Sequence, residues 1–149
     1  MSLKQQLQDD LTDAMRARDS VRLATIRMAL TSVTNEEVAG KQVRELSDDD
    51  VLKVLARELK KRKEAATAYS DAGHADRAAS ELAEAAVLET YLPAQLDDAE
   101  LASLVKGAIA EAGASGPQAM GAVMKLVQPQ IAGRAEGGRV AAEVKRQLA

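Results

Sequence analysis

The chain has 149 residues, 20 basic and 23 acidic side chains and a formal net charge of −3, a length that fits one ordinary domain or two small ones. It has no cysteine, one histidine and two aromatic residues, both tyrosines, which excludes disulfides, thiolate or multi-histidine metal sites and platforms of stacked bases. No apolar stretch is long enough to cross a membrane and the N-terminus lacks the apolar core of a signal peptide, so we expect a cytoplasmic protein with no membrane partner.

The first 40 residues predict two helices packed on each other. Apolar residues at every fourth position predict an amphipathic helix over residues 3 to 17, with Ser2 as its N-cap. Asp19 or Ser20 caps a second helix, whose apolar residues repeat at spacings of three and four. We expect Gly40 to end it, because glycine enters the left-handed cap without steric cost.

A third and a fourth helix follow a polar connector. Ser47 precedes three aspartates, which combines a hydroxyl cap with negative charge at the positive end of the helix dipole. The third helix carries Arg62 within its apolar stripe and stops at Gly73. The fourth has an apolar stripe that includes Leu82, and Pro93 ends it.

Three shorter helices are predicted in the last part of the chain. Asp97 and Glu100 have the spacing of a capping box that opens the first of them. Pro117 lies in the first turn of the second, and Pro129 limits that helix. The third follows the glycine-rich residues 133 to 138.

The fold class is therefore predicted to be all-α, because no segment alternates apolar and polar residues as a strand would. We expect an N-terminal long-helix bundle over residues 1–93 and a small C-terminal three-helix domain over residues 94–149. Seven of the nine glycines follow Pro93. The charge changes there as well, from 14 basic and 17 acidic side chains before Pro93 to six of each from Pro93 onward.

No assembled catalytic site is visible in the sequence. The chain has no glycine-rich P-loop and no serine in a G-x-S-x-G setting, so we expect no catalytic residues and no cofactor. Glu81 and Glu84 share a helix face, as carboxylate metal ligands do, but they lack a histidine partner and we interpret them as a solvated face rather than a metal site. His74, after a glycine, is interpreted as a turn residue.

The densest positive charge lies on the third predicted helix, at Arg57, Lys60, Lys61 and Arg62. This patch is suited to an anion or an acidic partner, although the favoured interpretation is a solvated face that nearby glutamates partly neutralise. Arg62 differs from the others because it lies in the apolar stripe. We expect its stem to pack and its guanidinium to reach a carboxylate or the groove between the domains.

A second basic region surrounds the glycine-rich residues 133 to 138. Backbone N–H groups, a helix dipole, Arg134 and Arg139 predict a phosphate cradle at this loop, as an alternative to an ordinary glycine turn. The predicted nucleic-acid-binding residues are these two arginines and three further cations nearby, Lys125, Lys145 and Arg146.

Five short sequence motifs, which follow one another along nearly the whole chain, resemble those of a known family. They are Leu46-Ser47-Asp48-Asp49-Asp50; Lys60-Lys61-Arg62 with Tyr69; Glu81 and Glu84 with Tyr91-Leu92-Pro93; Met120 to Lys125; and Gly133-Arg134-Ala135-Glu136-Gly137. With them the chain resembles the YqeY-like proteins, the GatB/YqeY domain family. It departs from the family pattern at His74, where arginine is frequent, and at Glu136, where aspartate is common.

The resemblance implies a two-part helical protein whose C-terminal part is related to the tail domain of the B subunit of the tRNA-dependent amidotransferase, which contacts tRNA. We therefore expect a non-catalytic, translation-associated module that contacts the phosphate backbone of tRNA or of another structured RNA. The alternatives are a helical bundle that binds a translation-related protein, and an amidotransferase-related carbon–nitrogen ligase that uses glutamine as amido donor within a complex. A helix-turn-helix DNA binder is disfavoured by the balanced charge of the last helices.

Overall fold

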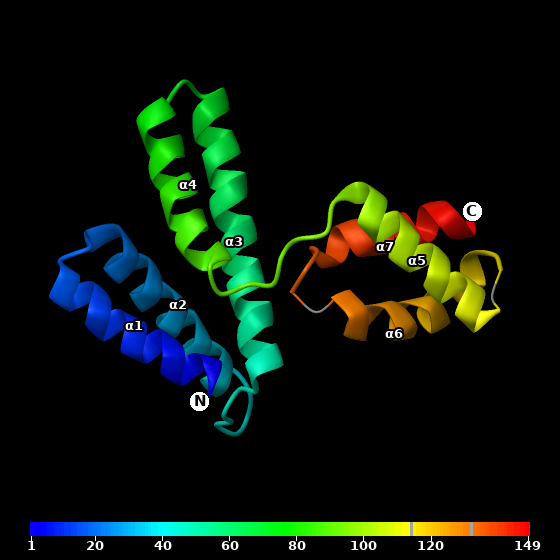
Figure 1. Cartoon of the computed structure of the whole chain (residues 1–149), viewed down its shortest axis with the longest axis horizontal. Coiled ribbons are helices and arrows are strands. Elements are labelled where there is room, and N and C mark those ends of the chain that lie inside the picture. The colour runs from blue at the N-terminus through cyan, green and yellow to red at the C-terminus, as the bar shows by residue number, and fades with distance from the viewer. Residues whose placement is uncertain (114, 132) are drawn as a thin grey trace. The chain divides into compact units, whose positions relative to one another are not determined.

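The computed structural model describes residues 1–113, 115–131 and 133–149, and these residues form helices and no strand, which confirms the all-α fold class (Figure 1). The chain divides into two compact units, an N-terminal unit, Met1–Leu92, and a C-terminal unit, Pro93–Ala149. The elements in chain order are α1 (Leu3–Ala17), α2 (Ser20–Val38), α3 (Asp48–Asp71), α4 (Ala75–Glu89), α5 (Asp98–Ala112), the 3-10 turn η1 (Pro117–Ala119), α6 (Met120–Ile131) and α7 (Gly137–Leu148).

Side-chain caps start the first three helices at the predicted residues. The oxygens of Ser2, Asp19 and Ser47 accept hydrogen bonds from backbone N–H groups three residues ahead, at 3.1, 3.1 and 3.2 Å. Each bond satisfies one of the donors that the first turn of a helix leaves without a partner. Ser47 is followed in the first turn by the three aspartates, where negative charge is favourable.

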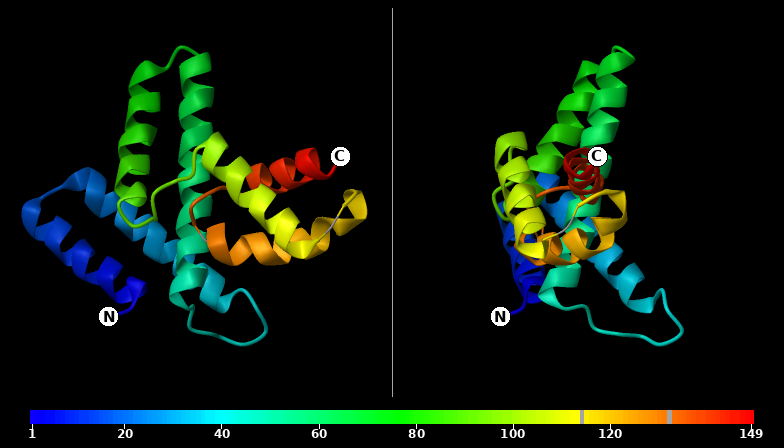
Figure 2. Two further views of the ribbon diagram at one scale, coloured as in Figure 1. Left: turned by 45° about the vertical axis from the view of Figure 1, so that its right-hand side comes forward. Right: turned by 90° about the vertical axis from the view of Figure 1, so that its right-hand side faces the viewer.

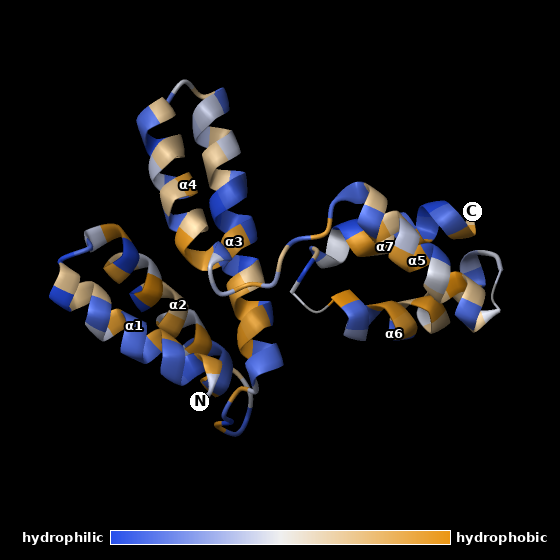
Figure 3. Cartoon of the chain, in the orientation of Figure 1, coloured by the Kyte–Doolittle hydropathy of each residue, from blue (hydrophilic) through white to orange (hydrophobic). Residues whose placement is uncertain are grey.

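The N-terminal unit consists of two helical hairpins, α1–α2 and α3–α4, which Figures 1 and 2 show from three sides. Gly73, with φ of 82°, makes the turn between α3 and α4, a conformation that costs other residues more. Figure 3 shows that, after a hydrophilic first turn, hydrophobic residues gather in the first half of α3, and that the helix is more hydrophilic beyond it. The first half packs into the core of the unit, whose largest fully buried side chains are Leu7, Ile26, Val33, Val51, Val54, Leu55 and Leu88.

Two predictions about this unit, those for Gly40 and Leu82, are wrong. Gly40 does not cap α2, which ends at Val38 with Ala39 in the right-handed region, and the φ of Gly40 is not positive. The carboxylate of Glu37, only 7% exposed, instead accepts a bond from the N–H of Leu46 at 3.3 Å and so holds the connector to the helix end. The same carboxylate accepts the ammonium of Lys4 from α1 at 2.8 Å.

Leu82 is 53% exposed and does not belong to the buried stripe of α4. The stripe is centred near Ala85, whose small side chain is buried together with those of Ala78 and Leu88. At 100° per residue, Leu82 and Leu88 lie about 60° from Ala85 on opposite sides, and the structure buries only the side of Leu88.

The C-terminal unit packs α5, α6 and α7 around a core of its own. Asp97 and Glu100 form the predicted capping box, with bonds of 2.7 and 3.1 Å. Pro129 does not limit α6, which continues through it to Ile131. Proline removes one N–H, but Ile131 is 3% exposed and its burial favours the last helical turn. The fully buried side chains of this core are Val105, Val123, Val127, Val140 and Val144.

Candidate functional site

A groove between α5 and α7 is the feature of the C-terminal unit that brings predicted site residues together. It has a volume of about 450 Å³. Leu101, Ala102 and Ala142 supply its apolar surface, and its charged side chains are Asp98, Arg139, Glu143 and Arg146. Two of the five predicted nucleic-acid-binding residues, Arg139 and Arg146, therefore line one concave surface.

The register of α7 explains why these two arginines share a face. They are seven positions apart, or nearly two whole turns, so they project on the same side of the helix. Val140, Val144 and Leu148 are buried on another side and fix the orientation of α7 on the core. Lys145 is adjacent to Arg146 and points about 100° away from it, so it does not line the groove.

Arg139 holds the chain that enters the C-terminal unit. Its Nη2 atom donates to the carbonyl of Leu96 at 3.2 Å and to Oδ1 of Asp98 at 2.9 Å. The side chain of Asp98 is 99% exposed and that of Arg139 is 38% exposed. Water screens such a pair, and exposed pairs contribute only about 0–1 kcal/mol, so an incoming anion can replace Asp98 at small cost.

Arg146 forms a two-pronged ion pair with Glu143, with Nη2···Oε1 of 2.5 Å and Nε···Oε2 of 3.0 Å. Hydrogen bonds from Arg146, and then from Gln147, lower the pKa of Glu143 to about 2. The bonds to Glu143 also raise the pKa of Arg146. Both groups therefore stay charged at every pH at which a binding experiment is practical.

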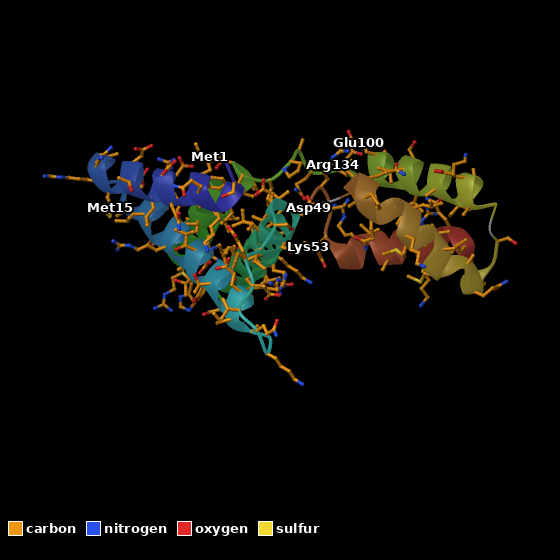
Figure 4. All side chains as sticks on the ribbon, turned by 90° about the horizontal axis from the view of Figure 1, so that it is seen from below. Met1, Met15, Asp49, Lys53, Glu100 and Arg134 are labelled. Atoms are coloured by element: carbon orange, nitrogen blue, oxygen red, sulfur yellow. The ribbon has the colours of Figure 1, made fainter. Side chains whose placement is uncertain are left out.

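Arg134 and the glycine-rich loop do not form the predicted open cradle. The Nε of Arg134, a residue labelled in Figure 4, donates to the carbonyl of Ala94 at 3.4 Å, and its own carbonyl accepts the N–H of Leu96 at 2.7 Å. Glu136 is the N-cap of α7, and its Oε1 lies 2.8 Å from where a Cβ on Gly138 would be. A phosphate approaching this helix end would therefore meet a carboxylate of the chain itself.

The basic patch predicted on α3 is divided by the structure. Arg57 is exposed and pairs with Glu36 at 3.2 Å, Lys60 lies 3.8 Å from Glu64, and Lys61 lies 3.3 Å from Glu58. These exposed cations are close to acidic side chains, as the solvated-face interpretation expected. Arg62 is not part of any exposed patch, because it is only 5% exposed.

The guanidinium of Arg62 joins three helices, and it reaches carboxylates as expected. Its Nη1 lies 2.7 Å from Oε2 of Glu58 on α3, its Nε lies 3.4 Å from Oε2 of Glu84 on α4, and its Nη2 contacts the sulfur of Met28 on α2 at 3.5 Å. Burial raises the pKa of Glu58, but hydrogen bonds from Arg62 and Ser32 outweigh this effect and the net pKa is lowered.

Glu84 is thus an ion-pair partner and not a purely solvated residue, with 29% of its side chain exposed. Its partner Arg62 is the residue that the sequence singled out, because it lies in the apolar stripe of α3. Among the described residues, no three histidine or acidic side chains come together as metal ligands would. His74 is the residue before α4, as the turn interpretation expected, and its ring meets that of Tyr69 edge to face.

Comparison with protein families assigns the chain. Residues 4–148 match the family described as Yqey-like protein, which is nearly the whole sequence. The chain belongs to the Yqey-like protein family. No curated protein matches it. Within the parts of the chain that the structure describes, no helix combines the length and hydropathy needed to cross a membrane.

Of the predicted nucleic-acid-binding residues of this Yqey-like chain, Arg139 and Arg146 share the groove, whereas Arg134 fastens the segment that enters the unit. Lys125 and Lys145 are exposed and lie outside the groove lining. Sequence reasoning missed Asp98 and Glu143, the acidic side chains that hold the two groove arginines. The spacing of three between Glu143 and Arg146 is the sequence signal that could have revealed their pairing.

Proposed function

We propose that the protein is a non-catalytic module that contacts tRNA, and that the groove between α5 and α7 is the surface that does so. The observation that carries the proposal is that Arg139 and Arg146, two turns apart on α7, line one groove. Membership of the Yqey-like family supports it, because the resemblance to that family implies a C-terminal part related to the tail of the amidotransferase B subunit.

The contacts would be made to the RNA backbone. A guanidinium presents a planar fork of donors that fits phosphate oxygens, and both groove cations are arginines. Both tyrosines lie in the N-terminal unit, so the C-terminal unit has no aromatic ring on which a base could stack. Recognition through phosphates and shape is therefore the mode that this surface allows.

The proposal predicts weak and salt-dependent binding. Asp98 and Glu143 offset both groove charges, so a phosphate gains only what remains after it displaces them. With about two to four phosphate contacts, the logarithm of the affinity should fall with a slope of about −1.5 to −3.5 against the logarithm of salt concentration.

Filter binding of the full chain to tRNA over a salt series tests the proposal. Arg139→Ala with Arg146→Ala should weaken binding at least tenfold and flatten the salt slope by about two. Arg16→Ala with Lys53→Ala is the matched control, because it removes two charges from exposed positions of α1 and α3. Equal loss in the two double variants, or no binding at low salt, would contradict the proposal.

Protein binding by the N-terminal unit is a second function with an observation in its favour. Large apolar side chains are exposed there: Met15, Val21, Met28, Val38, Val43 and Leu82. Copurification from lysate with and without ribonuclease separates the two functions. A defined protein retained after ribonuclease would support protein binding, whereas material lost on ribonuclease treatment would support RNA binding.

A further inference from the structure

The buried guanidinium of Arg62 has more donors than strong acceptors. A guanidinium carries five N–H groups, and Nη1 uses its two on Oε2 of Glu58 at 2.7 Å and on the carbonyl of Glu58 at 3.2 Å. The Nε atom has no hydrogen-bond partner among the residues that the structure describes, although it lies 3.4 Å from a carboxylate oxygen of Glu84. The remaining nitrogen, Nη2, donates to a thioether sulfur, a much weaker acceptor than an oxygen.

That thioether belongs to Met28, a residue that is about half exposed to solvent. Met28 is 52% exposed, while its sulfur lies 3.5 Å from Nη2 of Arg62. A thioether is a weak acceptor, whereas a sulfoxide oxygen is a strong one. Adding one oxygen at this sulfur would give the buried cation a strong acceptor in place of a weak one.

We propose that Met28 is a site of reversible oxidation, whose sulfoxide is held by the guanidinium of Arg62. In the reaction with hydrogen peroxide, the sulfur attacks one peroxide oxygen, an S–O bond forms and the O–O bond breaks. The transferred oxygen gives up its proton to the departing hydroxide, which leaves as water, and the sulfoxide remains. Sulfur loses two electrons and the peroxide gains them, so no further reactant is needed.

Met15 provides a matched comparison within the same unit. It is 48% exposed, and its sulfur lies 3.7 Å from Nη2 of Arg27. Arg27 is itself exposed, so water already serves its donors and a sulfoxide there gains little. The two methionines therefore have similar access to peroxide but different consequences once they are oxidised.

The consequences of oxidising each methionine are measured separately with two variants. Met15→Leu keeps Met28, and Met28→Leu keeps Met15. Each full-length variant is treated with hydrogen peroxide, oxidation is mapped by peptide mass spectrometry, and thermal unfolding is followed by tyrosine fluorescence. Both tyrosines lie in residues 1–92, so the signal reports the unit that contains both methionines. Methionine sulfoxide reductase then reverses the modification.

Oxidation of the Met15→Leu protein should raise its unfolding midpoint by about 4 °C, and the reductase should restore the original value. The Met28→Leu protein should show no rise. Without any oxidant, Met28→Gln should unfold at a higher temperature than Met28→Leu, because its amide oxygen also accepts from Arg62. The proposal is overturned if Met28 resists peroxide while Met15 reacts, if both oxidised proteins change alike, or if Met28→Gln is no more stable than Met28→Leu.

Discussion

Replacing Arg62 by methionine removes the cation that links α2, α3 and α4 while keeping the apolar stem of the side chain. Glu58 is 7% exposed and would lose its 2.7 Å partner in an interior from which water is largely excluded. Removing one partner of a buried ion pair typically costs about 3–5 kcal/mol, because the other charge stays behind without compensation.

The cost here should be smaller, since two partners of Glu58 remain. Ser32 donates to its carboxylate at 2.9 Å, and the ammonium of Lys61 lies 3.3 Å from the same oxygen. We therefore expect Arg62→Met to lower the free energy of unfolding of the N-terminal unit by about 2–4 kcal/mol.

Urea unfolding followed by tyrosine fluorescence measures this loss in the N-terminal unit alone. A double-mutant cycle with Glu58→Gln isolates the interaction between the two side chains. Arg57→Met, five residues earlier on the exposed side of α3, is the control and should change stability by less than about 0.5 kcal/mol. A loss below about 1 kcal/mol for Arg62→Met, or a coupling energy near zero, would refute the reasoning.

Four further substitutions test a helix cap, the acid response and two glycines. Ser47→Ala should destabilise the N-terminal unit by about 1 kcal/mol in urea unfolding, because the first turn of α3 loses its side-chain cap. The hydrogen bond from Lys4 lowers the pKa of Glu37 in the folded protein. The stability that ionised Glu37 contributes is therefore complete above its unfolded pKa of about 4.3 and is lost as the pH falls through its folded pKa. Wild-type stability should fall more steeply below about pH 4.5 than that of Glu37→Gln. Gly107→Ala should stabilise the C-terminal unit by about 0.5–1 kcal/mol, since no atom lies within 4 Å of the new Cβ, whereas Gly73→Ala, at a φ of 82°, should destabilise the N-terminal unit by about 1 kcal/mol, both measured by circular dichroism.

Three of these expectations would be contradicted by the following results. An unchanged urea midpoint for Ser47→Ala would mean that the three aspartates suffice to start α3. Parallel pH profiles for wild type and Glu37→Gln would remove Glu37 from the acid response. Destabilisation by Gly107→Ala would show that the α5 surface is more crowded than the structure indicates.

The sequence was most informative where a local interaction decides the structure. Ser2, Ser47 and the Asp97–Glu100 pair start their helices as expected, because a cap needs only residues within one turn. Gly40 misled, since the end of α2 depends on Glu37, whose carboxylate binds a residue of the connector and a lysine of α1. Such long-range bonds leave no periodic signal.

The candidate site shows the same limit. The spacing of Arg139 and Arg146 placed them on one face, but the sequence could not reveal that α5 would pack beside that face and form a groove. The phosphate cradle at the glycine-rich loop looked favourable from composition. The side chain of Glu136 folds back toward Gly138, which residue types and spacing do not disclose.

Titrating the ¹⁵N-labelled full chain with unlabelled tRNA, and following backbone amide signals by NMR, tests the central claim most directly. We expect shifts or broadening concentrated at residues 98–102 and 139–146, with α1 to α4 unaffected, and their loss in the Arg139→Ala, Arg146→Ala double variant. Changes confined to the N-terminal unit, or spectra that tRNA leaves unchanged at low salt, would contradict the assignment of the α5–α7 groove as an RNA-contacting surface.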